Sequence, residues 1–183
     1  MADTKNMKNI FSTLDALLEN TDLSKVTAES TGFSELKDGY YLCEVKKAEL
    51  KASKSSGNPM AAFQLKVVED GTDFRFDTKN KATPIALKGT KNRMIFKYYV
   101  FKDETSVQRF AGEMLRFEDE NGEPILTKEY FTTSELIEDA LDVLIGMHIY
   151  VHIDTTENAD GTSSTWSNLI TWKTASTLGL KVD

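Results

Sequence analysis

Two stretches of the sequence carry the residue types that contact polyanions. The first is a six-residue polar link, residues 54–59, which begins with Lys54 and has Gly57-Asn58 at its tip. Lys51 lies three residues before the link. The second is RMIFKYYVFK, residues 93–102, which is the most aromatic strand-like segment of the chain. Lysine and arginine follow a phosphate backbone, and aromatic rings stack on unpaired bases of any identity. The two stretches together favour a site for single-stranded nucleic acid.

The distribution of charge favours the same ligand. The chain has 183 residues and a net charge of −7. Between Lys37 and Lys102, however, 14 basic residues stand against seven acidic ones, a net of +7, whereas the rest of the chain carries −14. A basic segment inside an acidic protein indicates a polyanionic partner, and the alternative is an uneven scatter of solubilising charge.

Composition excludes several classes of protein. A hydrophobic content of 40% and a charged content of 28% are typical of a globular domain that buries a core. The apolar runs are too short to span a bilayer, and the N-terminus lacks the apolar region of a secretory signal. Cys43 is the single cysteine, so no internal disulfide forms. We expect a cytoplasmic protein with no membrane partner.

Catalytic patterns are weak. Glu49-x-Lys51 matches part of a nuclease pattern, but the aspartate that should lie on a neighbouring strand is missing. His148 and His152 would lie ~13 Å apart on a strand, too far for one metal ion. The sequence has no P-loop, dinucleotide fingerprint or cysteine pair. We therefore predict no enzymatic activity, no cofactor and no metal.

The first 30 residues are predicted to be an appendage. Their apolar residues fall at helical spacing and are followed by a polar linker. The stripe consists of Ile10, Phe11, Leu14, Leu17 and Leu18. Residues 31–183 are expected to form the binding domain.

Strand patterns dominate the first part of that domain. Tyr41, Cys43 and Val45 alternate as the inward series of a strand, so Cys43 is predicted to be a small core residue. The alternation changes phase at Lys46-Lys47, which predicts a β-bulge. After Pro59 a second strand alternates through residues 61–67. Residues 70–92 are expected to be a long basic connection, and residues 93–102 the third strand.

Two helices and two strands follow. The first helix has an apolar stripe through residues 107–115, with Thr105 and Gln108 at capping-box spacing. The second is predicted to begin at Thr132-x-x-Glu135 and to end at Gly146. Residues 147–154 alternate as a fourth strand, and residues 165–173 supply the last.

This order predicts an all-β core with helices, namely the OB-fold, a five-stranded Greek-key barrel with its helices between the third and fourth strands. A split sandwich would use the same elements. OB-folds bind oligomers on the second and third strands, between the loop joining strands 1 and 2 and the loop joining strands 4 and 5. Residues 51–59 would form the first of these loops, with Lys51 and Lys54 at its rim.

The third strand has two possible outward faces. Lys97 shares a face with Tyr99 and Phe101, and lysine is uncommon in a core, so we predict that this face points outward; a single bulge would reverse the assignment. The predicted nucleic-acid-binding residues are Lys46, Lys51, Lys54, Lys66, Phe74, Arg75, Arg93, Lys97, Tyr99, Phe101 and Trp166.

The runs DGYYLCEVKKAELKASKSSGNPM, RMIFKYYVF and RFAGEML resemble phage-encoded OB-fold single-stranded DNA-binding proteins. The shared features are Gly39-Tyr40, the hairpin from Lys54 to Met60, and the entry to the fourth strand near Leu144. The resemblance implies DNA replication or recombination in the cytoplasm of an infected bacterial host. The chain ends LGLKVD rather than in an acidic tail, so the N-terminal helix becomes the candidate for recruiting phage or host proteins.

One other function fits the same elements. An OB-fold can be a non-enzymatic protein-interaction or virion-assembly module, because fold does not determine function. That alternative does not explain why positive charge gathers on the strands and loops that an OB-fold uses for binding. A homo-oligomer is compatible with either function, and stacking with phosphate contact suits RNA as well as DNA.

Overall fold

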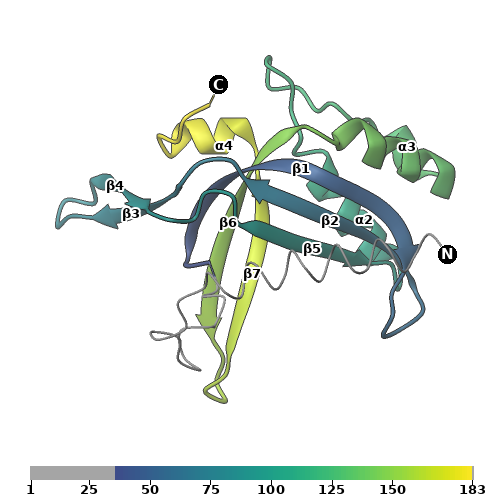
Figure 1. The fold of residues 1–183 in the computed structure, drawn as a ribbon, viewed down its shortest axis with the longest axis horizontal. Coiled ribbons are helices and arrows are strands. Elements are labelled where there is room, and N and C mark those ends of the chain that lie inside the picture. The colour runs from purple at the N-terminus through teal and green to yellow at the C-terminus, as the bar shows by residue number, and fades with distance from the viewer. Residues whose placement is uncertain (1–35, 183) are drawn as a thin grey trace, which may run out of the picture. The chain divides into compact units, whose positions relative to one another are not determined.

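The computed structural model describes residues 36–182, and the structural statements below concern that part of the chain. It contains an antiparallel sheet with a few helices, which confirms the predicted class (Figure 1). The predicted helix of residues 1–30 lies outside the described residues. The strands are β1 (Gly39–Ala52), β2 (Pro59–Val67), β3 (Gly71–Phe76), β4 (Ala82–Leu87), β5 (Met94–Val100), β6 (His148–Glu157) and β7 (Ser163–Ile170). The helices are α2 (Glu104–Met114), the short 3-10 helix η1 (Lys128–Phe131), α3 (Ser134–Leu144) and α4 (Trp172–Thr177).

The predicted bulge in β1 is confirmed. Val45 pairs with Leu65 and Lys47 pairs with Gln64, so Lys46 is the extra residue. Tyr41, Cys43 and Val45 are buried before the bulge, and Ala48 is buried after it. A bulge bends its strand. The first half of β1 accordingly pairs with β6, and most of its second half pairs only with β2.

The count of five strands is wrong, because the connection over residues 70–92 folds into a hairpin. β3 pairs with β4 along its length but meets β1 only at Tyr40 and Thr72. The Asp77 carboxylate closes the turn by accepting from the backbone N–H groups of Lys79 and Lys81, at 2.8 and 2.9 Å. Figure 1 shows this hairpin projecting away from the strands it follows.

The helical stripes were predicted correctly, but the capping residues were not. Phe110 and Met114 of α2 are buried, as are three residues of α3. The N-cap of α2 is Asp103, in a capping box with Ser106, and the N-cap of α3 is Thr133. Each helix therefore begins one or two residues away from the predicted capping position.

The last two strands complete the sheet. Ile149, Val151 and Ile153 of β6 are buried as predicted. Tyr150 is buried as well, because α4, which was not predicted, packs with Trp172 edge-on against it at 5.8 Å. No helix in residues 36–182 is both long enough and apolar enough to cross a membrane.

Strand pairing leaves one junction open. The order across the sheet is β5–β2–β1–β6–β7, with the β3–β4 hairpin attached to β1. β5 pairs only with β2, and β7 pairs only with β6. We call the junction between β5 and β7 the seam.

Candidate nucleic-acid interface

The outward face of β5 is the reverse of the predicted one. Phe96 and Tyr98 are 54% and 56% exposed, whereas Tyr99 is only 9% exposed. The reason is the register with β2, in which Tyr99 lies opposite Ala61 and Lys97 opposite Phe63. Directly paired residues share a face of the sheet. Ala61 and Phe63 both point into the core, so Tyr99 and Lys97 follow them.

Phe101 also belongs to the interior. It lies just after β5 and packs edge-on against Phe110 of α2, with ring centroids 5.1 Å apart. The prediction that Lys97, Tyr99 and Phe101 point outward is therefore wrong, whereas their contact with nucleic acid stays a prediction. The outward assignment assumed that lysine avoids a core, and the assumption failed because the buried Lys97 side chain has polar partners.

Those partners form a buried polar cluster. Glu113 of α2 accepts a hydrogen bond from the Tyr99 hydroxyl at 2.5 Å and pairs with the Lys97 amine at 3.2 Å. The Lys97 amine also donates to the backbone carbonyl of Ser167 on β7. Burial lowers the pKa of Lys97, and the Glu113 carboxylate opposes that shift. The Lys97 amine is thus held by Glu113 of α2 and by the backbone of β7.

The exposed rings gather at the seam. Phe96 and Tyr98 of β5 and Trp166 of β7 line one groove of about 530 Å³, which we call the β5–β7 groove. Trp166 is 57% exposed, and its indole N–H donates to the Thr156 hydroxyl at 3.4 Å. The exposed guanidinium of Arg109 lies in the same lining. Trp166 was predicted as a binding residue; Phe96, Tyr98 and Arg109 were not.

The lysines of β1 are engaged by acids of their own strand. Lys46 pairs with Glu44 at 2.9 Å, and Lys47 and Lys51 both pair with Glu49 at 2.7 Å. Hydrogen bonds from Lys47 and then Lys51 lower the pKa of Glu49 to about 2. The predicted contacts Lys46 and Lys51 are thus exposed but already paired.

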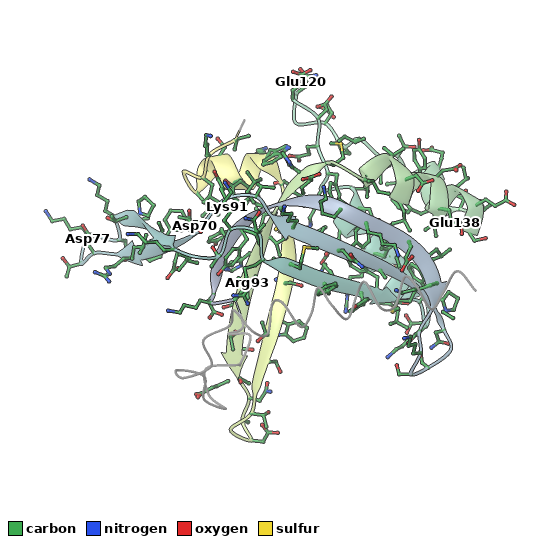
Figure 2. All side chains as sticks on the ribbon, in the orientation of Figure 1. Asp70, Asp77, Lys91, Arg93, Glu120 and Glu138 are labelled. Atoms are coloured by element: carbon green, nitrogen blue, oxygen red, sulfur yellow. The ribbon has the colours of Figure 1, made fainter. Side chains whose placement is uncertain are left out.

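Other predicted cations are differently placed. Lys54, in the turn after β1, is exposed and makes no ion pair within residues 36–182. Lys66 lies on the outward face of β2, opposite Met94 and next to the row of Phe96. Arg93 is half-buried and lies immediately before β5 (Figure 2).

The β3–β4 hairpin holds a second group of cations. Arg75, Lys79 and Lys81 are exposed, and none of them has an ion pair in the described part of the chain. Phe76 beside them is 63% exposed. Phe74, one of the predicted binding residues, packs edge-on against Tyr40 at 5.7 Å. Phe76, Lys79 and Lys81 were not named as candidate binding residues, because the sequence pattern assigned residues 70–92 to a connection.

Residues 36–182 contain no group of three or more potential metal ligands. His152 stacks on Tyr40 with centroids 4.3 Å apart, and His148 lies four residues away on the same strand. Cys43 is buried as predicted, and burial raises the pKa of its thiol well above the usual value.

A comparison with protein families gives one match, over residues 19–111, to the family described as protein of unknown function (DUF669). The match covers just over half of the chain. The chain belongs to this family. Within the described residues the match runs from β1 to α2 and includes both hairpins, while Trp166 lies outside it. No curated protein matches the chain.

Proposed function

We propose that this DUF669 protein binds single-stranded DNA without sequence preference across the β5–β7 groove. The observation that carries the proposal is the meeting of three exposed rings, Phe96, Tyr98 and Trp166, around one groove. Exposed rings cost hydration free energy in the absence of a partner, and unpaired bases offer flat apolar faces to cover them. Each stacked base contributes about 1–3 kcal/mol.

The cations supply the sequence-neutral part of the binding. Arg109 borders the rings, Lys66 lies on the adjoining strand, and Lys54 and the β3–β4 hairpin extend the positive charge along the sheet. Lysine and arginine on phosphates fix the strand but carry no sequence information. Such binding weakens steeply as salt rises.

The proposal includes an OB-type barrel as the scaffold. The pairing β5–β2–β1–β6–β7 follows the order that an OB-fold requires, and the bulged β1 contributes to both halves. The β3–β4 hairpin is then an insertion between the second and third barrel strands. The seam is the place where such a barrel would close.

The biological setting rests on the resemblance of residues 38–60, 93–101 and 109–115 to phage single-stranded DNA-binding proteins. We propose replication or recombination of phage DNA in the host cytoplasm, with the N-terminal segment available to partner proteins. A protein-interaction or virion-assembly module is the second candidate. It requires no affinity for nucleic acid.

The decisive experiment compares neighbouring residues of β5. Phe96→Ala and Tyr98→Ala should each weaken binding to oligo-dT by about 1–3 kcal/mol while leaving the melting temperature unchanged, since neither ring fills the core. Tyr99→Ala is the matched control one residue away. It should instead lower the stability of the fold by about 3–5 kcal/mol, as expected for a large buried side chain.

Titrations with oligo-dT, matched RNA and duplex DNA separate the alternatives. Wild-type affinity in the Phe96 and Tyr98 variants would remove the β5–β7 groove from the binding site. No affinity of the wild-type protein for any single strand would refute the proposed function and favour the interaction module.

A further inference from the structure

Two charged side chains, one from β5 and one from the segment after α2, bond to the β7 backbone at the seam, where β5 and β7 are not paired. The Lys97 amine of β5 donates to the carbonyl of Ser167, and the Arg116 guanidinium, just beyond α2, donates to the carbonyl of Leu169 at 2.7 Å. Ser167 and Leu169 are two residues apart on β7, so their carbonyls point to the same edge. In a closed barrel these carbonyls would accept from backbone N–H groups of β5. Here a lysine and an arginine take that place.

The bridge formed by Lys97 lies at the same groove as the exposed rings, because Lys97, Glu113 and Ser167 belong to the lining of the β5–β7 groove. Lys97 stands between Phe96 and Tyr98 in the sequence, and its side chain leaves the opposite face of β5. Ser167 directly follows Trp166. The contact from Lys97 to Ser167 therefore joins the backbone that carries two rings to the backbone that carries the third.

Glu113 fixes the lysine in that position. Its carboxylate holds Lys97 at 3.2 Å and Tyr99 at 2.5 Å, so β5 is tied to α2 on either side of Tyr98. The side chains of Lys97 and Glu113 are only 12% and 11% exposed. Removing one member of such a pair leaves a buried charge without a partner, so separating Lys97 from Glu113 is strongly unfavourable.

We propose that Lys97, held by Glu113, is a positioning residue that sets the separation of Phe96 and Tyr98 from Trp166 across the seam. The inference rests on the proposed single-stranded DNA site and names what determines its geometry. Lys97 acts through the β7 backbone and touches no phosphate. Stacking needs rings held close to their productive positions, because a small displacement of a supporting residue weakens binding sharply.

The test variant is Lys97→Met combined with Glu113→Gln. It removes both charges together, so neither is left unpaired, and the amide oxygen of the new glutamine keeps an acceptor for the Tyr99 hydroxyl. Lys66→Met is the matched control, because Lys66 lies on the adjacent strand but on the outward face. Should the double variant fail to fold, Lys97→Gln with Glu113→Gln, which also removes both charges but keeps polar groups on both sides, is measured in the same way.

The first measurement needs no nucleic acid. Amide hydrogen exchange in the full-length protein should become about tenfold faster in β7 of the double variant, since opening β7 no longer breaks a hydrogen bond to a charged amine. Exchange in β1 and β2 should match the wild type. Unchanged exchange in β7 would overturn the positioning role.

The second measurement is the dependence of oligo-dT affinity on salt. The double variant should bind about tenfold or more weakly with the wild-type slope of log K against log salt, because one poorly stacked base already loses about that much. Lys66→Met should make the slope shallower by about 0.7, the value for one phosphate contact. A shallower slope in the double variant would mean that Lys97 contacts phosphate, and wild-type affinity would mean that the rings need no positioning.

The two proposals can fail separately. If the wild-type protein binds no single strand, the proposed function fails, and the exchange of β7 alone decides whether Lys97 holds the seam. If the wild type binds and the double variant binds equally well, the function stands and the inference about Lys97 is wrong.

Discussion

The two hairpins of this protein are both basic, yet they present their charge differently. In the β1–β2 hairpin, Lys46, Lys47 and Lys51 are each paired with a glutamate of β1. In the β3–β4 hairpin, Arg75, Lys79 and Lys81 have no ion pair within the described residues. In the first hairpin the lysines of β1 are locally compensated, and Lys54 in the turn is the exception. The second offers cations that a polyanion can use.

Spacing alone does not produce this difference. Residues two apart on a strand share a face, which brings Glu49 to both Lys47 and Lys51. Arg75 also has acids two residues away on either side. Those acids are aspartates with shorter side chains, and both bond to backbone: Asp73 accepts from the N–H of Phe74, and Asp77 closes the turn. An acid that caps a turn does not neutralise its neighbour.

The largest effect should come from removing the cations of the second hairpin. Arg75→Ala with Lys79→Ala and Lys81→Ala should make the slope of log K against log salt shallower by about 2, at about 0.7 per phosphate, for oligo-dT long enough to reach the hairpin. The control is Lys51→Ala with Lys54→Ala. It should change the slope by only about 0.7, because Lys51 is already paired.

Fluorescence titrations over a range of salt concentrations measure both slopes. Equal changes in the slope for the two variants would show that pairing with the glutamates of β1 does not keep these lysines from contacting phosphate. An unchanged slope in the triple variant would remove the second hairpin from the binding site. A loss of affinity seen only with duplex DNA would show that the hairpin binds duplex and not single strands.

A smaller effect should follow from releasing the lysines of the first hairpin. Glu49→Gln leaves Lys47 and Lys51 without their carboxylate, so binding should become tighter at low salt and the slope steeper by up to about 1.4. Glu138→Gln on α3 is the control, since it changes the net charge equally at an exposed position that belongs to neither hairpin (Figure 2). If the two substitutions tighten binding equally, net charge is responsible and the pairing of Glu49 is irrelevant.

Much of the fold could be predicted because local patterns determine it. The alternation through Tyr41, Cys43 and Val45 and its break at Lys46 placed the bulge, and the helical stripes placed α2 and α3. The second hairpin gave no such signal. Most of its side chains are exposed on both faces, so no alternation of apolar and polar residues marks its strands. Short elements of this kind depend on turns such as the one at Asp77.

The site was harder to predict than the fold for a physical reason. The face of β5 was assigned from the rule that lysine avoids a core, and that rule holds only for lysines without a buried partner. The partner, Glu113, lies 16 residues further on and in another element. Register with β2, which fixed the true face, is likewise a property of two strands and not of one. The sequence identified the aromatic strand correctly and the side of it incorrectly.

The smallest effect concerns pH and should be close to none. The hydrogen bonds from Lys47 and Lys51 lower the pKa of Glu49 from its ordinary 4.5 to about 2. A depressed folded-state pKa means that the pairing is complete above the ordinary value and is lost only as the pH falls towards the lowered one. The affinity ratio of Glu49→Gln to wild type should therefore stay constant between about pH 8 and pH 5 at fixed ionic strength. Oligo-dT titrations at several pH values measure this ratio, with Glu138→Gln as the reference. A ratio that shrinks towards one above pH 5 would show that Glu49 is protonated there, and the contrast between the two hairpins would then depend on pH and not on the pairing within β1.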